Sequence, residues 1–353
     1  MDAVLAEMFS PQNVTMRDVA VRAGVTAATV SLALRDSPEI SAQTKARVLA
    51  AVQELGYRPN PYVQSLMRTR RRGRGAASQA TLALLTAFPT RQGWRADPTP
   101  MFTQLFAGAG ERAESAGFRL EEFWLHEQGM SPKRFAEVLR ARGIVGVLVA
   151  PLPEPHALGG LPWEDFAAVA LGFTLLDPLL HRVANDHLHS MLTAHAECRR
   201  LGHRRLGLVL TKEVHEKVQR RWLAGYMLAQ REDAGEARLE PLLAPELTAE
   251  EFQHWFDRER PDVVITASPG RVTTWLKARG LAIPRDVGVV SLSAPEQGGP
   301  LSGIYQNFEQ IGRRAVDLLV AALERNELGP PALADTLLVD GVWNPGTTVT
   351  VRG

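Results

Sequence analysis

The spacing of apolar positions in residues 14–34 predicts two short helices. Thr15 can cap a first helix that ends at Gly24, and Thr26 can cap a second helix, Ala27–Leu34. The apolar positions recur at helical spacing in both, and they are Met16, Val19, Ala20, Ala23, Val30, Ala33 and Leu34. The Ala-Gly-Val-Thr turn between the helices is short enough to make them cross steeply, which is typical of a helix-turn-helix.

A third helix follows, and then the pattern breaks. Ser41 can cap this helix and Gly56 can end it, with an apolar stripe made of Val48, Leu49, Val52 and Leu55. The sequence Arg-Pro-Asn-Pro at 58–61 interrupts the chain before a short helix candidate, Tyr62–Met67. Residues 68–75 then form a basic linker rich in Arg and Gly.

From Thr81 onward, short apolar runs alternate with amphipathic helical patterns. Strands are predicted at Thr81–Ala87, Phe118–Trp124, Gly146–Ala150, Ala168–Leu171, Leu206–Leu210, Val263–Thr266 and Gly288–Leu292. Helices are predicted at Met101–Ala116, Pro132–Arg142, His189–Leu201, Arg221–Gln230, Ala249–Arg258, Arg271–Arg279 and Glu309–Asn326. This alternation predicts parallel sheets with helices on both faces. Seven strands in about 270 residues favour two α/β subdomains, with a ligand cleft between them.

These patterns divide the chain into four segments. We expect a flexible tail at 1–13, a helix-turn-helix headpiece at 14–60, and a hinge helix with its basic linker at 61–77. The body is expected at 78–353. Its N-subdomain is placed at about 78–198 and 308–335, and its C-subdomain at about 199–307 and 336–353.

Composition places the chain among globular proteins. Its 353 residues are 45% hydrophobic and 22% charged. The single cysteine, Cys198, excludes an intrachain disulfide and a cysteine-based zinc site. No apolar run approaches the ~20 residues of a membrane helix. The first 14 residues lack the basic and apolar regions of a secretory signal, so we expect a cytoplasmic protein.

Charge is distributed unevenly although the net charge is only +1. Residues 14–75 hold eleven Arg or Lys and four Asp or Glu, a net charge of +7, whereas residues 1–13 carry −2 and the remaining 278 residues carry −4. A basic head on an acidic body indicates contact with a polyanion such as nucleic acid. A solvated basic tail would give the same composition.

The headpiece resembles that of the LacI/GalR repressor family. The similarity covers residues 14–34, 40–48, 55–60 and 63–66. The body resembles the same family more loosely at 200–209, at Gly225-Tyr226, at 283–290 and at 311–319. The resemblance implies a body shaped like a periplasmic sugar-binding protein, with two Rossmann-like subdomains joined by crossing strands. The expected fold is therefore an all-α headpiece on an α/β body, and the expected function is that of a DNA-binding transcription regulator, in this family most often a repressor.

In such a headpiece the second helix lies in the major groove and presents its N-terminal residues to the bases. Here these residues are Ala27 and Ala28, with Leu32 one turn on. Their side chains cannot donate hydrogen bonds, so we expect weak direct readout and more reliance on phosphate contacts and DNA deformability. The expected phosphate partners are Thr15, Thr26, Thr29, Ser31, Arg35, Tyr57 and Asn60. The Thr and Ser residues could also serve simply as helix caps.

The resemblance assigns the hinge a second DNA contact. Leu66 corresponds to an apolar wedge that enters the minor groove at the centre of a palindromic operator, with Gln64 and Met67 beside it. Leu66 could instead pack the hinge against a second copy, and both roles can coexist. Paired hinge helices require a homodimer, whose two-fold symmetry matches the palindrome.

The effector cleft departs from the family pattern. Trp222 stands where the family usually has an Arg, and Ser293 where it usually has an Asp, so the usual clamp on sugar hydroxyls is missing. Trp222 could stack on a small molecule such as a sugar, with Arg221 shifted into the site. It could instead plug the cleft, or a protein partner could replace the ligand. The candidate lining residues are Phe88, Phe102, Asp186, Arg221, Trp222, Ser293, Gln306 and Phe308.

Other function classes find less support. His181, His187, His189 and His195 occur near Asp186, but His187 and His189 would lie on different faces of a helix, so no metal site is expected. Nucleophile, P-loop and dinucleotide motifs are absent from the sequence, so we expect neither an enzyme nor a cofactor. A plain ligand-binding protein would not need the headpiece. A DNA-binding protein without sequence preference remains a rival, because the second helix is so apolar.

Overall fold

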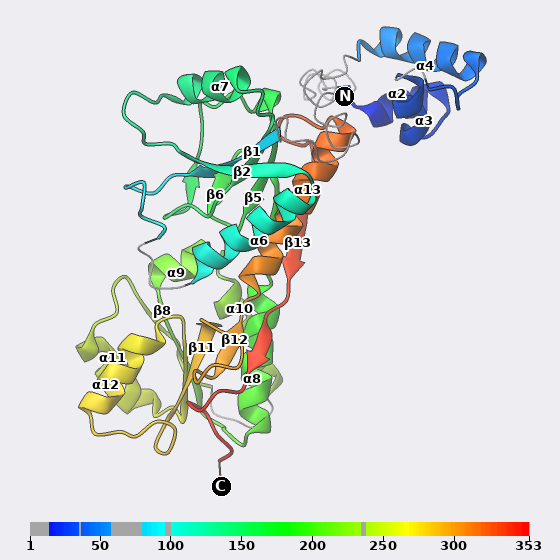
Figure 1. Ribbon diagram of the computed structural model, residues 1–353. Helices are drawn as coiled ribbons and strands as arrows, with labels where there is room; N and C mark the ends of the chain where they lie inside the picture. Colours follow the sequence, from blue (N-terminus) through cyan, green and yellow to red (C-terminus); the bar gives the residue numbers. More distant parts are fainter. Residues whose placement is uncertain (1–13, 35–36, 58–79, 96–99, 234–237, 353) are drawn as a thin grey trace, which may run out of the picture.

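The computed structural model describes residues 14–34, 37–57, 80–95, 100–233 and 238–352. Within these residues the chain forms a small helical headpiece and a body with two six-stranded sheets. Figure 1 shows the two sheets in separate subdomains, one above the other, with the headpiece beside the upper one. No helix in the described part of the chain is long and apolar enough to cross a bilayer.

Local capping defines the headpiece helices α2 (Met16–Ala23), α3 (Ala27–Ala33) and α4 (Ala42–Leu55). Thr15, Thr26 and Ser41 each cap the following helix through the side-chain oxygen, as the sequence predicted. The C-caps of α2 and α4 are Gly24 and Gly56, both in the left-handed region that favours glycine.

The headpiece has its own core. It consists of Val19, Ala20, Ala23, Val30, Ala33, Val48, Ala51 and Tyr57. The predicted stripe of α4 is wrong at one position, because Leu49 is 50% exposed. Ala51 takes the inward position instead, three residues after Val48 and therefore on the same face of the helix.

The first body sheet has the order β13-β7-β5-β3-β1-β2, and all its pairings are parallel. Its strands are β1 (Ala80–Thr86), β2 (Phe118–Trp124), β3 (Gly146–Val149), β5 (Ala167–Leu171), β7 (His181–Asn185) and β13 (Thr336–Val339). Helices α6 (Met101–Ser115) and α13 (Phe308–Arg325) cover one face, and α7 (Pro132–Ala141) with the short η1 (Trp163–Asp165) covers the other. The strands β4 (His156–Ala157) and β6 (Leu175–Asp177) form a separate ribbon.

The second sheet has the order β14-β12-β11-β10-β8-β9 and is parallel except for the β12–β14 pair. Its strands are β8 (Leu206–Thr211), β9 (Leu242–Ala244), β10 (Val263–Thr266), β11 (Gly288–Ala294), β12 (Gly303–Tyr305) and β14 (Val342–Asn344). Helices α8 (His187–Arg200) and α10 (Arg221–Glu232) cover one face, and α11 (Ala249–Glu259) with α12 (Pro269–Ala278) covers the other. The short helix α9 (Lys212–Lys217) directly follows β8.

The described chain passes between the subdomains after β7, after β12 and after β13. Two of the expected crossing points need correction. Helix α8 packs in the second subdomain through Met191, Ala194 and Cys198, so the first crossing lies near Asp186 and not at 198/199. Strand β13 pairs with β7, so the last crossing follows Val339 and not residue 335.

Helices α6 and α13 lie side by side in Figure 1 and approach each other backbone to backbone. A Cβ atom on Gly108 would lie 2.0 Å from the Glu309 carbonyl oxygen, and one on Gly312 would lie 2.2 Å from the Leu105 carbonyl oxygen. The N-terminal ends of both helices lie near the second subdomain. The close contact between the helices therefore holds these two ends in place at the junction between the subdomains.

Candidate DNA-binding face and inter-subdomain site

The outer side of α3 is short of polar groups. Val30 and Ala33 are buried in the headpiece core, whereas Ala28 is exposed and Ala27, Ser31 and Leu32 are partly exposed. Thr26 Oγ1 accepts a hydrogen bond from the Thr29 backbone N–H at 3.2 Å and lies 2.9 Å from Thr29 Oγ1. The two threonine hydroxyls therefore satisfy each other at the start of the helix.

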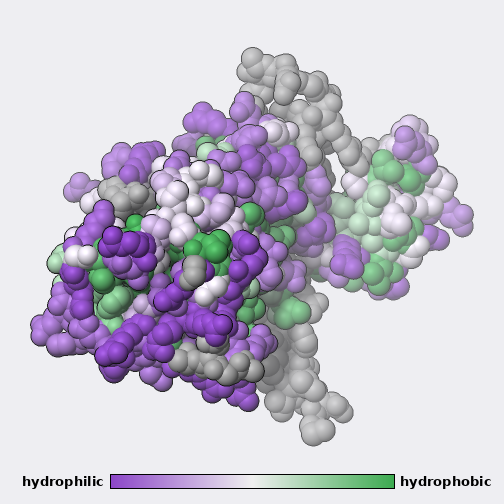
Figure 2. All heavy atoms as spheres, turned by 90° about the horizontal axis from the view of Figure 1, so that it is seen from below, coloured by the Kyte–Doolittle hydropathy of each residue, from purple (hydrophilic) through white to green (hydrophobic). Residues whose placement is uncertain are grey.

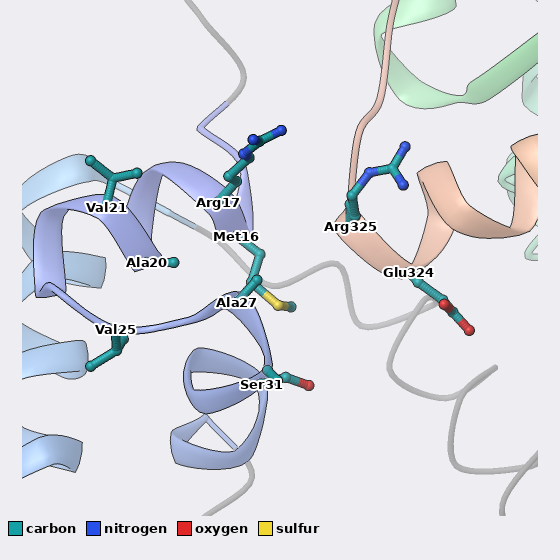
Figure 3. A pocket seen from close by; sticks show the side chains of 10 residues that line it. Met16, Arg17, Ala20, Val21, Val25, Ala27, Ser31, Glu324 and Arg325 are labelled. Carbon is teal, nitrogen blue, oxygen red and sulfur yellow. The ribbon is translucent and has the colours of Figure 1, made fainter.

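A hollow of about 520 Å³ lies against this side of the headpiece. Figure 3 shows Arg17 and Ser31 extending from the headpiece toward the gap that separates it from the C-terminal end of α13. The headpiece residues that line the hollow are Met16, Arg17, Ala20, Val21, Val25, Ala27, Ala28 and Ser31. Arg17 is exposed, and no hydrogen bond or ion pair links its guanidinium to another described residue. It is a cationic side chain beside the recognition helix that the sequence analysis did not select.

Two predicted phosphate partners have structural roles. Thr15 forms a capping box with Asp18, in which the Thr15 hydroxyl donates to the Asp18 carboxylate at 2.6 Å. Tyr57 is 4% exposed and packs in the headpiece core, and its contact with a phosphate stays a prediction. The predicted contacts Arg35, Asn60, Gln64, Leu66 and Met67 lie outside the described residues.

A second candidate site lies where the two subdomains meet, around Phe173. This residue follows β5 in the first subdomain and is 3% exposed. The Arg221 guanidinium, from the first turn of α10 in the second subdomain, lies 4.4 Å from the centre of the Phe173 ring. The guanidinium of Arg182, from β7, lies 5.9 Å from the same ring. Two cations from different subdomains thus lie within 6 Å of one aromatic ring.

His187 joins this cluster at the start of α8. Its imidazole lies 5.8 Å from the Phe173 ring and 4.9 Å from the Trp222 ring, edge-on to the latter. Burial and then the nearby Arg221 guanidinium lower the pKa of His187 to about 3, although the Asp186 carboxylate acts in the opposite direction. The imidazole is therefore neutral at pH 7, and the cations of the cluster are the two arginines.

Trp222 is 5% exposed and packs in the core of the second subdomain with Met191 and Tyr226. Its buried ring is not an open platform on which a flat ligand could stack, which corrects that hypothesis. Its indole Nε1 is buried and has no hydrogen-bond partner among the described residues.

Polar side chains connect the subdomains near the cluster. Gln104 of α6 donates through Nε2 to the Pro295 carbonyl oxygen at 3.2 Å. Asn185 donates through Nδ2 to the Gln306 carbonyl oxygen at 2.5 Å. The Gln306 side chain is 1% exposed and donates to the Leu292 carbonyl, which leaves its Oε1 buried and unpartnered.

The other residues predicted to line the cleft pack in the protein interior or form local hydrogen bonds. Phe88 and Phe102 meet edge to face with their ring centres 5.0 Å apart, and Phe308 is 7% exposed in the core of the first subdomain. Asp186 caps α8 by accepting from the His189 backbone N–H, and the Ser293 backbone N–H donates to Ser291 Oγ. The structure therefore brings Asp186, Arg221 and Trp222 together around His187, whereas Phe308 is a core residue.

The sequence analysis missed Phe173 and Arg182 as members of this cluster, and Gln104 and Asn185 as side chains that bond across the junction. A signal was available for Phe173, because it follows a buried parallel strand, and such strand ends converge at one edge of a sheet. No such signal marked Arg182, which lies in β7, a strand whose polar residues interrupt the apolar pattern.

The histidines considered for a metal do not converge. His181 accepts from the Asp335 backbone N–H at 3.0 Å, His195 lies 3.6 Å from the Asp233 carboxylate, and His187 faces Phe173 and Trp222. Among the described residues no group of three or more His, Cys, Asp or Glu side chains could hold a metal ion.

Two family models match separate parts of the chain. The model described as "Bacterial regulatory proteins, lacI family" matches residues 15–60, which include the three headpiece helices. The model described as "Periplasmic binding protein-like domain" matches residues 196–341.

Similar proteins cover nearly the whole chain. The HTH-type transcriptional regulator AscG of Escherichia coli (strain K12) is 27% identical over 334 residues, which are 90% of this chain and 94% of AscG. A solved complex of the transcriptional regulator CelR with cellobiose has a TM-score of 0.56 at 23% identity and covers 94% of this chain and 100% of CelR. The lac repressor dimer bound to operator and the anti-inducer ONPF has a TM-score of 0.55 at 20% identity and covers 96% of this chain and 100% of the repressor chain. The two structures share the fold of this chain.

Proposed function

The chain is a transcription regulator of the LacI family, and on this premise we propose that it represses transcription by binding a palindromic operator as a homodimer. The observation that carries the proposal is the headpiece. Its three capped helices surround a core of their own, and they precede a body of two α/β subdomains. A helix-turn-helix dimer contacts two half-sites, which explains the preference for a palindrome.

We assign the DNA contacts to the outer side of α3 and to the start of α2. Ala27, Ala28 and Leu32 would face the bases, and Ser31 with Thr29 would approach the phosphates. Arg17 is added to the proposed set, because it is a charged group without an ion pair to any described residue on the same side. Few polar groups face the bases, so much of the affinity should depend on salt.

The junction between the subdomains is the proposed effector site. The similar CelR was solved with cellobiose, and the similar lac repressor with ONPF. The cluster of Phe173, Arg221 and His187 lies between two α/β subdomains, and a ligand bound there can change their separation. We propose that a sugar or a related metabolite binds there and changes operator affinity.

The proposed function also implies where the protein acts and whether it is an enzyme. A regulator of transcription acts on DNA, so we place it in the cytoplasm. The similar protein AscG is named as a transcriptional regulator, and we propose that this chain is a regulator without enzymatic activity. For the body we propose that the N-subdomain comprises the first sheet with β13, and that α8 belongs to the C-subdomain.

Operator selection from random DNA with the purified full chain tests the function. We expect enrichment of a two-fold symmetric sequence that binds at least about a thousandfold more tightly than random DNA at the same salt concentration. Equal affinity for the selected and the random DNA would contradict the proposal. That result would support an architectural protein without sequence preference.

A further inference from the structure

Two arginines that approach one aromatic ring at the junction of the subdomains have no ion pair to a carboxylate among the described residues. We propose that this site binds an oxyanion group, a phosphate or a carboxylate, of a small metabolite. The inference rests on the proposed function, since it names the chemical class of the effector. The binding residues are Arg182 and Arg221, whose guanidiniums both lie near the Phe173 ring.

Arg182 is the buried member of the pair, with 6% of its surface exposed. Its Nη2 donates to the Leu175 carbonyl oxygen at 3.4 Å, and its guanidinium faces Phe173. No ion pair joins it to a carboxylate among the described residues, whereas Arg140, Arg142 and Arg199 each form one. A guanidinium presents five N–H donors, and one long hydrogen bond leaves most of them free for a ligand.

Arg221 approaches the same ring from the other subdomain. Its Nε is buried and has no hydrogen-bond partner among the described residues. It also stands at the first turn of α10, where the N-cap residue Arg220 makes no side-chain cap hydrogen bond. The Arg221 backbone N–H donates to the Val218 carbonyl oxygen, but the helix N-terminus still adds partial positive charge, which favours an anion.

The surrounding charges do not neutralise the pair. Burial and the Arg221 guanidinium lower the pKa of Arg182, so the two cations disfavour each other. The Asp186 carboxylate raises the pKa of His187 and accepts a hydrogen bond from the His189 backbone N–H, which caps α8. His187 itself is neutral at pH 7. Stacking on Phe173 offsets only part of the cost of desolvating two cations, whereas a bound oxyanion would pair with both of them.

The two arginines lie in different subdomains, so an anion bound to both would change how the subdomains are arranged. Arg182 belongs to the first subdomain and Arg221 to the second, so one oxyanion held by both would draw the subdomains together. A ligand that binds one arrangement of the subdomains more tightly shifts the population toward that arrangement.

Calorimetric titration of the full chain tests the proposal at constant ionic strength, with chloride as the balancing anion. The probes are inorganic phosphate, glucose 6-phosphate, gluconate and glucose. We expect the phosphates or the carboxylate to bind and glucose to bind at least about tenfold more weakly. Whether phosphate or gluconate binds more tightly identifies the oxyanion.

Arg221→Gln should weaken oxyanion binding at least about tenfold, because it removes the charge while keeping a similar length. Arg220→Gln is the matched control. It changes the neighbouring arginine, which is 70% exposed and paired with Glu216, and it should bind like the wild type. Arg182→Gln should give the same loss as Arg221→Gln where it folds, but Arg221→Gln decides the test alone.

The proposal is overturned if no oxyanion probe binds the wild type, or if Arg221→Gln binds phosphate as tightly as Arg220→Gln. Glucose binding that is as tight as glucose 6-phosphate binding, and independent of Arg221, would also overturn it. That last result would leave an effector site between the subdomains intact. Failure of the regulator itself would appear separately, as the absence of a selected operator.

Discussion

At the residue scale, Arg17 shows how a single charge can matter on an apolar recognition face. We expect Arg17→Ala to weaken binding to the operator and to random DNA by similar factors, because a phosphate contact carries no base information. The slope of log affinity against log salt should fall by about one. Fluorescence anisotropy with labelled operator over a range of salt concentrations measures both effects.

The control for this variant is Arg22→Ala on the same helix. Its guanidinium is bonded to Glu54 within the headpiece at 2.6 Å, so it is engaged away from DNA. This exposed pair should contribute little to stability. A salt slope that changes equally in both variants would argue against a specific role for Arg17.

His187 gives a second prediction at this scale. Its pKa is about 3 in the folded chain and about 6.5 in the unfolded chain, so between these values the unfolded state binds more protons. The contribution of His187 to the free energy of unfolding is therefore complete above pH 6.5. It falls as the pH drops toward 3, by at most about 1.4 kcal/mol per pH unit. Denaturant unfolding between pH 4 and 7.5 should show this slope.

His187→Gln should reduce the slope, because glutamine does not titrate. The exposed His189 lies on the same helix, and His189→Gln serves as the control that keeps the wild-type profile. Equal slopes in all three proteins would show that the burial of His187 does not govern acid sensitivity.

At the scale of elements, the crossing of α6 and α13 depends on glycine at two positions. A methyl group at Gly108 or Gly312 would overlap the backbone of the facing helix, and backbone atoms cannot move aside cheaply. We expect Gly312→Ala or Gly108→Ala to lower the free energy of unfolding by about 3 kcal/mol. Chemical denaturation followed by circular dichroism measures the change.

Gly110→Ala is the matched control on α6, because a Cβ there would meet no atom within 4 Å. It should be neutral or stabilise the helix by up to about 1 kcal/mol, since alanine is the better helix former. If Gly108→Ala proved as harmless as Gly110→Ala, the helices would not be held at backbone contact.

The elements also show the limits of pattern analysis. Two strands were predicted to the residue, Phe118–Trp124 and Val263–Thr266. The strands β4, β6, β7, β9, β12, β13 and β14 were missed, and they have two to five residues each. Most of these strands have two or three residues, which show no recognisable period. The longer β7 is interrupted by polar residues, and the edge strand β13 is largely exposed. These short strands nevertheless determine where the chain crosses between the subdomains.

At the scale of the whole molecule, the proposed function requires a dimer. Figure 2 views the body from the end of the second subdomain and shows a mainly hydrophilic surface with separate hydrophobic areas. Sedimentation equilibrium of the full chain should give twice the 38.7 kDa of one chain at micromolar concentration. A monomer that still binds a palindrome with high affinity would contradict the dimeric mode.

Some features of this protein follow from the sequence by itself. Capping residues and apolar spacing determined the headpiece helices, because a cap acts within three residues along the chain. Alternation of apolar strands and amphipathic helices determined the α/β body for the same local reason. The apolar character of Ala27 and Ala28 is likewise visible in the sequence.

Only the tertiary structure decided the rest. Trp222 was selected as a possible ligand platform and is a core residue, whereas Phe173, Arg182 and Arg221 come from separate elements to form one cationic site. The positions of Arg182 and Arg221 in the sequence do not indicate that these side chains meet. Parallel sheets bring distant strand ends to one edge, and which side chains then face each other depends on strand order and on the three passages between subdomains.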